Sequence, residues 1–423
     1  MEVLAEREQW SRSEIADFQL QKINQIWDYA ITHVPYYRRL LRDRNLPRQF
    51  QTLGEYASSV PVLDKATVRS AQVLSDTPRP GNWYFTGGST GIPLAVYQET
   101  EATNEMAWCQ YRARVLWNVG LFEKRALLWG HPTQITPGSG HKLRQLFTDL
   151  MLNRIRFSVY NLGKADLLRY LSRMREFKPV QLYGYSIATY LLALEALRGN
   201  IEVDSLRLVT LTAERATETI RQTIEQAFET NVTEEYGARE CLLIAYEDRQ
   251  HLLRIREDNV MVETLPLGDG CYRIIISVLS NPSFPLLRYD IGDLTEKPLT
   301  ETNVGFSLLA PVTGKANDYL IGASGRRIYA GVLHGLYHYP IRRFIAHQFS
   351  DGKVLMLMEP NGPATNMDIG SMERKLRALL DGQEVEVRLT ESIPQTSLNK
   401  HRWIISEITN AQPRQSVHSS PMM

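Results

Sequence analysis

The hydrophobic residues of this chain recur with two different spacings. Helical spacing, with apolar residues every three or four positions, covers four segments of the first 230 residues: 14–31, 166–178, 186–198 and 217–228. We expect Asp166 to be the N-cap of the second of these helices. Short apolar runs typical of buried strands occupy 125–130 and 206–211. This alternation favours an α/β fold, in which helices cover a sheet.

The pattern changes toward the C-terminus. Strand-like runs dominate residues 252–280 and predict a β-rich subdomain there. After Gly314 the chain has two strand-like runs around Asp351-Gly352, a helix closed by Gly382, and a last alternating strand. We therefore expect three parts, a large N-terminal domain, a small α+β C-terminal domain and a disordered tail rich in Ser, Pro and Gln: residues 1–314, 315–410 and 411–423.

Composition narrows the choice of partners. The chain has 423 residues, 48 basic and 47 acidic side chains, and a formal net charge of +1. This balance gives no electrostatic reason to expect nucleic acid or an anionic membrane as a partner. No segment approaches the ~18 uncharged apolar residues of a membrane span. The three cysteines, Cys109, Cys241 and Cys271, are odd in number and widely spaced, which predicts a reducing cytoplasm and no paired-cysteine zinc site.

The segment Phe85–Pro93 carries the most specific chemistry. Three glycines and three hydroxyl side chains within 86–91 allow a tight turn whose N–H groups face an anion. The turn has no Gly-Lys-Ser/Thr, so it is not a Walker A loop, and a cation for a phosphate must come from elsewhere. The same stretch contains Gly-x-Ser-x-Gly at 87–91, but the proline and strand-like residues that follow disfavour the helix that a serine hydrolase needs after its nucleophile. A purely structural turn remains an alternative.

At this loop the sequence resembles the adenylate-forming superfamily, and more narrowly its phenylacetate–coenzyme A ligase and capsule-biosynthesis CapK-like group. The resemblance covers nearly the whole chain, because further motifs follow in the expected order. They are the segments 29–37, 60–65, 212–214, 236–240, 285–293, 314–318 and 393–402. The resemblance implies a large adenylate-forming domain followed by a small mobile lid.

The resemblance also implies roles for individual residues. Lys400 would be the catalytic lysine, Glu240 would hold Mg²⁺ and take part in catalysis, and Asp318 would be the hinge. The acyl pocket would be lined by His131, Tyr185 and Ala238. The ATP site would comprise Thr86, Gly87, Gly88, Ser89, Thr90, Gly91, Ala213, Glu214, Tyr236, Gly237, Asp293 and Lys315.

Several positions depart from the family pattern. Ala213 and Asn399 stand where glycine is usual, and Arg239 replaces a hydroxyl residue. Ile291 replaces threonine, and Lys315 replaces arginine, which reduces a two-pronged contact to a point charge.

The implied reaction uses ATP and Mg²⁺ to convert a carboxylic acid into an acyl-AMP, which is then transferred to a thiol, most often that of coenzyme A. The acceptor could instead be an amine, an amino acid or a carrier-protein thiol. A homodimer of this chain is expected by analogy only. A non-catalytic binding protein derived from a ligase is a further alternative. The sequence does not identify the acid.

Overall fold

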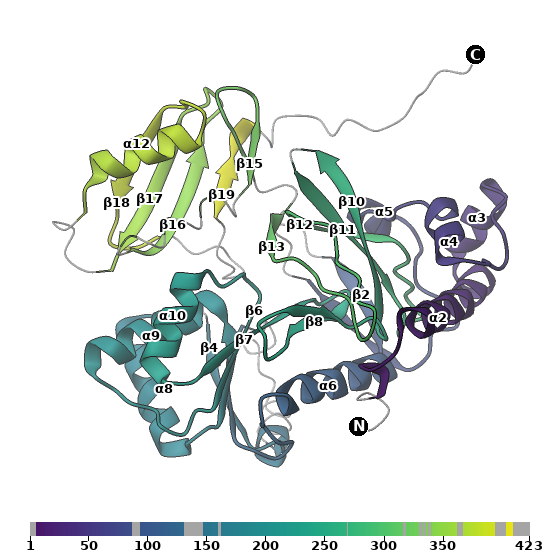
Figure 1. Ribbon diagram of the computed structural model, residues 1–423, viewed down its shortest axis with the longest axis horizontal. Coiled ribbons are helices and arrows are strands. Elements are labelled where there is room, and N and C mark those ends of the chain that lie inside the picture. Colours follow the sequence, from purple (N-terminus) through teal and green to yellow (C-terminus); the bar gives the residue numbers. More distant parts are fainter. Residues whose placement is uncertain are drawn as a thin grey trace. The chain divides into compact units, whose positions relative to one another are not determined.

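The computed structural model describes residues 6–86, 94–130, 147–159, 162–268, 270–315, 319–329, 333, 336, 339, 341–361, 367–393 and 403–408. The chain divides into two compact units (Figure 1). The first consists of Met1–Ile291 and Thr295–Val312, and the second of Gly292–Leu294 and Thr313–Met423. The two units are described separately below.

The first unit is built on a seven-stranded sheet with the order β4-β3-β5-β6-β7-β8-β9. The first five strands in this order run parallel, and the last two are antiparallel to their neighbours. The bounds are β3 Arg125–Trp129, β4 Arg154–Ser158, β5 Gln181–Tyr185, β6 Leu208–Thr212, β7 Asn231–Ala238, β8 Leu242–Glu247 and β9 Leu253–Ile255. The expected α/β class is confirmed, and the two predicted strands lie within two residues of β3 and β6.

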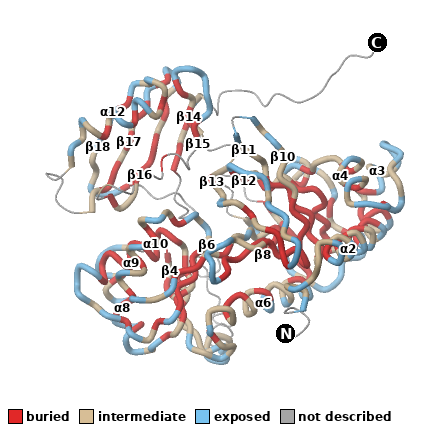
Figure 2. The backbone as a smooth tube through the Cα atoms, in the orientation of Figure 1, coloured by how far each residue is buried: buried red, intermediate tan, exposed pale blue. Residues whose placement is uncertain are grey.

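Helices connect the parallel strands, as parallel pairing requires. They are α8 Lys164–Phe177, α9 Ser186–Gly199 and α10 Glu218–Phe228. The first eleven residues of α9, 186–196, are all buried, which explains why this helix is apolar on every face. Figure 2 shows the buried positions along β8 in the same unit.

The ends of these helices differ from expectation in one place. The N-cap of α8 is Gly163, so the prediction of Asp166 was wrong; Asp166 lies in the first turn and pairs with Arg169 at 2.6 Å. A carboxylate is favourable there because it meets the positive end of the helix dipole. The helices α8, α9 and α10 end at residues with left-handed backbone, Lys178, Asn200 and Glu229.

The N-terminal region packs on a second sheet. Its helices are α2 Arg12–His33, α3 Pro35–Asp43, α4 Leu53–Ser59 and α5 Lys65–Ser70. Aromatic residues of this region, among them Trp27, Tyr37 and Tyr56, form a core with Met261 and Leu279. The sheet has the order β10-β11-β12-β13, and its strands are β10 Val260–Gly268, β11 Cys271–Val278, β12 Tyr289–Thr295 and β13 Val312–Lys315. The expected β-rich region over 252–280 is therefore present.

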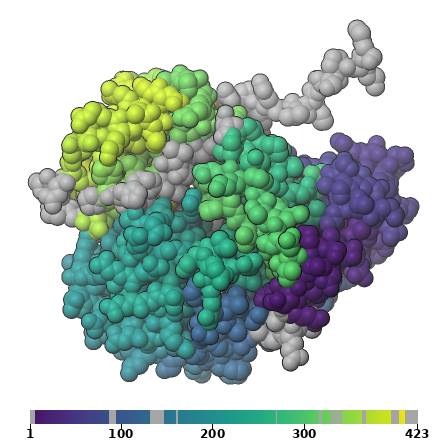
Figure 3. Space-filling view, viewed as in Figure 1, coloured from purple at the N-terminus to yellow at the C-terminus, as the bar shows by residue number. Residues whose placement is uncertain are grey.

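The start of the chain lies against a later turn of the same unit. The N–H of Gly305 donates to the carbonyl of Trp10 at 2.8 Å, and Figure 3 shows these purple N-terminal residues beside green ones. Gly305 has φ +79°, and a Cβ there would stand 2.9 Å from the carbonyl oxygen of Glu8. This close approach requires glycine.

The second unit contains a four-stranded sheet with the order β18-β17-β16-β19 and the helix α12 Ile369–Leu379. The strands are β16 Ile341–Gln348, β17 Val354–Pro360, β18 Val385–Leu389 and β19 Ile404–Ser406, beside a small pair, β14 Tyr319–Ile321 and β15 Arg327–Tyr329. Gly352, at φ +94°, lies in the predicted turn between β16 and β17. The N–H of Gly382 donates to the carbonyl of Arg377 after α12, as expected of a glycine that closes a helix.

Candidate functional site

The glycine-rich segment joins two paired strands, β1 Gly81–Phe85 and β2 Ala95–Glu99. Two hydrogen bonds close the neck of the loop: Thr86 N donates to Leu94 O at 2.9 Å, and Leu94 N donates to the Thr86 hydroxyl oxygen at 3.1 Å. The Thr86 hydroxyl hydrogen can still be donated elsewhere. The predicted residues Gly87, Gly88, Ser89, Thr90 and Gly91 lie outside the described residues. Strand β2 follows closely, so Ser89 is not followed by the long helix of a nucleophile elbow.

Both strands of this hairpin contact the turn after β7. The Gln98 side-chain amide donates to the carbonyl of Arg239, and the Arg239 guanidinium lies 4.9 Å from the ring centre of Tyr84. Arg239 is therefore engaged with the hairpin in this structure. The contact brings the neck of the glycine-rich loop to the segment 236–240, which the family resemblance predicts to bind the same nucleotide.

The segment 236–240 is shaped by a bulge between β7 and β8. The register shifts at Tyr236 and Gly237, and a Cβ on Gly237 would stand 2.5 Å from the Leu242 carbonyl oxygen. Glycine is thus required by the close approach of the backbone. Tyr236 and Ala238 are partly buried and pack against the core of the β-rich region.

Glu240, in the turn that follows, is 7% exposed. Its Oε1 accepts a hydrogen bond from the Tyr289 hydroxyl at 3.2 Å and lies 3.7 Å from Lys65 Nζ. A carboxyl group that is this buried needs such partners, because the loss of hydration is otherwise costly. Lys65 ends the 60–65 motif, but no local pattern in the sequence reveals a partner as distant along the chain as Glu240.

Glu240 fits the requirements of Mg²⁺, which is usually held by one or two carboxylates together with substrate phosphates and water. Among the residues that the structure describes, there is no cluster of three or more His, Cys, Asp or Glu placed to hold a metal ion. A metal at Glu240 would therefore depend on oxygen ligands from the substrate.

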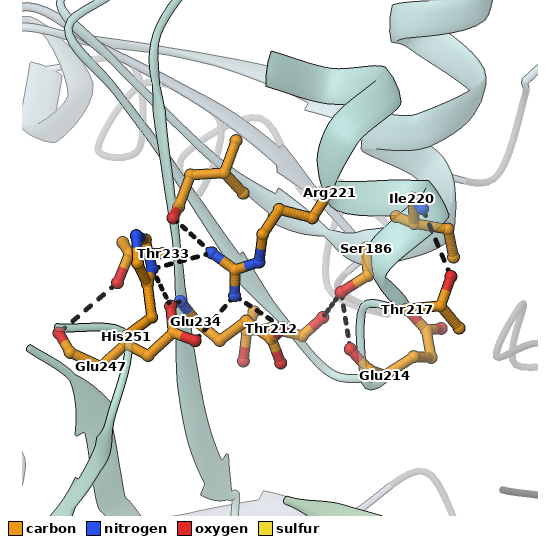
Figure 4. A network of polar contacts seen from close by, with 11 residues as sticks. Ser186, Thr212, Glu214, Thr217, Ile220, Arg221, Thr233, Glu234, Glu247 and His251 are labelled. Atoms are coloured by element: carbon orange, nitrogen blue, oxygen red, sulfur yellow. Dashed lines mark hydrogen bonds and ion pairs between the residues drawn. The ribbon is translucent and has the colours of Figure 1, made fainter. Parts of the chain in front are cut away.

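The segment 212–214 begins at Thr212, the last residue of strand β6, and continues into the turn after it. Ala213 has φ +73°, a left-handed conformation in which an alanine is strained and a glycine is not. The Ser186 hydroxyl donates to the Glu214 carbonyl at 2.6 Å and, at 3.4 Å, to that of Thr212 (Figure 4). Because Ser186 is the first residue of α9, this helix fixes the shape of the candidate adenine-binding segment.

A second part of the network in Figure 4 centres on Arg221 of α10. Its guanidinium donates to Glu247 at 2.7 Å, to Glu234 at 3.2 Å and to the Val232 carbonyl at 2.5 Å, and it lies 3.2 Å from His251 Nδ1. Burial raises the pKa of Glu234 to about 7, although Arg221 acts in the opposite direction. The network ties α10 to β7 and β8 and so positions the strand that leads to Tyr236.

Tyr185 belongs to an aromatic cluster at the end of β5. Its hydroxyl donates to the Gly130 carbonyl at 3.3 Å, and its ring meets Trp129 edge-on at 4.8 Å. Tyr183 stacks on the same Trp129 and donates its hydroxyl to Glu235 at 3.1 Å. Burial raises the pKa of Glu235 to about 7. The expected pocket residue His131 lies outside the described residues.

The second unit, which includes residues 292–294 of β12 and 313–315 of β13, holds the remaining predicted residues. Asp293 on β12 is 8% exposed and forms an ion pair with Lys315 at the end of β13. The expected hinge residue Asp318 and the expected catalytic Lys400 lie outside the described residues. On the two sides of the Lys400 segment, Ile393 is buried and Ile404 pairs with Ala346 in β16.

In the described part of the chain, no helix combines the length and the apolar character that crossing a bilayer requires.

No protein-family model matches the sequence. Protein CapK of Staphylococcus aureus is 23% identical over 318 residues, which cover 73% of this chain and 69% of CapK. Phenylacetate–coenzyme A ligase of Thermus thermophilus is 25% identical over 357 residues, which cover 75% of this chain and 74% of that enzyme.

A solved structure resembles nearly the full length of the chain. It is 2-hydroxyisobutyryl-CoA ligase in the postadenylation state, in complex with 2-HIB-AMP, with a TM-score of 0.76, 18% identity, and coverage of 95% of this chain and 91% of that one. The chain therefore has the fold of that ligase. Together with the two relatives in sequence, this likeness confirms the resemblance on which the expected fold rested.

Proposed function

We propose that this chain, which has the fold of an adenylate-forming ligase and is related to CapK and phenylacetate–coenzyme A ligase, is an ATP-dependent ligase of a carboxylic acid. The acid would be converted to an acyl-AMP with release of pyrophosphate, and the acyl group would then pass to coenzyme A. The observation that carries the proposal is the contact between the glycine-rich hairpin and the turn with the buried carboxylate of Glu240.

In this proposal the first unit binds the substrates. The loop 86–91 receives the phosphates with its backbone N–H groups, and residues 213, 214, 236 and 237 surround the adenine. Glu240 holds Mg²⁺, which neutralises charge on the leaving pyrophosphate. Tyr185, Ala238 and His131 border the acid.

The C-terminal part would supply the remaining groups. Asp293 would accept hydrogen bonds from the ribose hydroxyls, since an ionised carboxylate accepts such bonds strongly. Lys400 would bridge the carboxylate and the α-phosphate, where its charge opposes the repulsion between two anions. We assign 1–314 to the adenylation domain, 315–410 to a lid that turns near Asp318, and 411–423 to a tail. The separation of contacts between Val312 and Thr313 supports this boundary.

Acid-dependent exchange of labelled pyrophosphate into ATP tests the first half-reaction. A panel of aryl and small alkyl or hydroxy acids should contain at least one that supports exchange. Lys400→Ala should reduce the rate by about 10²–10³-fold or more while the circular dichroism spectrum stays unchanged. Exchange at the wild-type rate in Lys400→Ala would remove this lysine from the mechanism, and no exchange with any acid would reject the activity.

Product analysis then identifies the acceptor. With the active acid and ATP, coenzyme A should give a thioester, and the related phenylacetate–coenzyme A ligase supports this expectation. An amide product formed with an amine or amino acid instead of coenzyme A would make the chain an amide ligase. We expect it to act in the cytoplasm, where both ATP and coenzyme A are present.

A further inference from the structure

The glycine-rich loop contains no lysine or arginine between Thr86 and Gly91, so a cation for the ATP phosphates must come from another part of the chain. Arg239, the nearest cationic side chain along the 236–240 segment, is occupied with the Tyr84 ring and the hairpin. We propose that Lys65 is one such cation, in addition to Lys400 at the α-phosphate: it neutralises Glu240 before the nucleotide binds and moves to the phosphates when MgATP enters. This inference rests on the proposed function and adds a binding residue to it.

The position of Lys65 is set by its backbone. Lys65 is the first residue of α5, whose N-cap Asp64 accepts a hydrogen bond from Thr67 N at 2.7 Å. Just before it, Leu63 N donates to the Arg288 carbonyl and Leu63 O accepts from Asp290 N, both at 2.9 Å. These bonds hold the segment beside Tyr289, whose hydroxyl contacts the same Glu240 oxygen. These backbone hydrogen bonds therefore place both Lys65 and Tyr289 beside the Glu240 carboxylate.

The contact between Lys65 and Glu240 is one that the lysine can leave for another anionic partner. At 3.7 Å the ammonium group is beyond hydrogen-bond distance, so the attraction is a charge–charge interaction without a directional bond. The Lys65 side chain is 32% exposed, and its four-carbon stem can move the charge by several bond lengths. Glu240 keeps the Tyr289 hydroxyl bond when Lys65 leaves.

The charges then determine where Lys65 goes. A buried carboxylate without a cation is unfavourable, so Lys65 stabilises Glu240 in the nucleotide-free protein. With Mg²⁺ bound at Glu240, Lys65 would face a second cation a few ångströms away, and the two positive charges would repel each other. The phosphates that enter with the metal offer Lys65 a new anionic partner. Moving to them keeps every charge in the site compensated.

Nucleotide binding without turnover provides the test. Calorimetry with α,β-methylene-ATP and Mg²⁺ should show roughly 10- to 100-fold weaker binding for Lys65→Met than for wild type, as expected for one or two charge-assisted hydrogen bonds. Lys65→Arg keeps the charge and should bind within a few-fold of wild type. Lys297→Met, which removes an exposed lysine of the same unit, is the matched control and should bind like wild type.

Adenosine separates a phosphate contact from a structural role. Its affinity should be unchanged in Lys65→Met, because it has no phosphate. Equal losses for adenosine and for the triphosphate analogue would overturn the proposal, as would wild-type affinity for the analogue. Lys65→Gln provides the same comparison if the methionine variant does not fold. If the wild-type protein binds no nucleotide, the proposed function itself fails; if it binds and exchanges pyrophosphate but Lys65→Met matches it, only this inference fails.

Discussion

Glu235 and Glu240 lie five positions apart, and each is 7% exposed, yet their surroundings differ. Glu235 belongs to strand β7, and its carboxylate accepts hydrogen bonds from the neutral groups of Tyr183 and Gln110, with Arg114 nearby. Glu240 lies in the turn after the strand, where Lys65 provides an ammonium group at 3.7 Å. The two carboxyl groups are therefore equally buried, but the hydration that each has lost is replaced differently: by neutral hydrogen-bond donors at Glu235 and by a lysine at Glu240.

The difference follows from the partners that a carboxyl group meets in the interior of a sheet and in a turn. The strand residue faces helix α6 (Thr100–Val115), which offers Gln110 and Arg114 but no cation in direct contact, and the Glu235 carboxyl holds a proton up to about pH 7. The turn residue meets a flexible lysine from a different part of the chain. We infer that Glu235 serves the structure and Glu240 the ligand.

The largest effect expected from this comparison is on activity. Glu240→Gln removes the charge that Mg²⁺ needs and should lower pyrophosphate exchange by about 100-fold or more. The same chemical change at Glu235 is the control and should alter exchange by only a few-fold. Similar losses in both variants would show that burial rather than the lysine partner sets the role. No loss in either variant would remove Glu240 from the mechanism.

Asp293 extends the comparison to the second unit. It is also nearly buried and has a lysine partner, Lys315, so it resembles Glu240 more than Glu235. Asp293→Ala should raise the KM for ATP about 10- to 100-fold, because each hydrogen bond to a charged group contributes ~1.5–3 kcal/mol. Exchange kinetics at varied ATP check this, and an unchanged KM would reject the ribose contact.

The raised pKa of Glu235 should make the stability of the folded protein depend on pH. Its pKa in the folded protein, about 7, lies above the ordinary value of 4.5. Its contribution to stability is therefore complete below about pH 4.5 and is lost as the pH rises through 7. Glu235→Gln should have nearly wild-type stability at pH 5 but exceed it by up to roughly 3 kcal/mol at pH 8. Urea unfolding at both pH values measures this, and a pH-independent difference would contradict it.

The smallest expected effect is at Ala213. Glycine at φ +73° is free of the strain that alanine experiences, so Ala213→Gly should stabilise the protein by about 1 kcal/mol despite the added flexibility of the unfolded chain. Ala216→Gly is the matched control, because its backbone is not left-handed, and it should destabilise the protein. A thermal scan of both variants distinguishes conformational strain from a general tolerance of glycine.

Local spacing predicted much of the fold. Helix α9 begins at Ser186 as expected, and β3 begins at Arg125, since apolar periodicity and turn residues act over a few positions. The start of α8 was misplaced because Asp166 is a good N-cap by type, whereas Gly163 takes that position. The partner of Glu240 could not be predicted, because Lys65 reaches it only through the bridge between Leu63 and Tyr289. The roles of Lys400, Asp318 and the loop 87–91 stay predictions.

The left-handed helix ends of the first unit have a consequence for engineering. Lys178 and Glu229 end α8 and α10 just before β5 and β7 begin, so they lie at the sheet edge opposite to the one where residues 213 and 236–240 gather. Glycine is the residue most suited to such ends, and each replacement would recover a fraction of a kcal/mol to about 1 kcal/mol. Heat tolerance could thus be increased on one side of the sheet while substrate chemistry on the other side stays untouched.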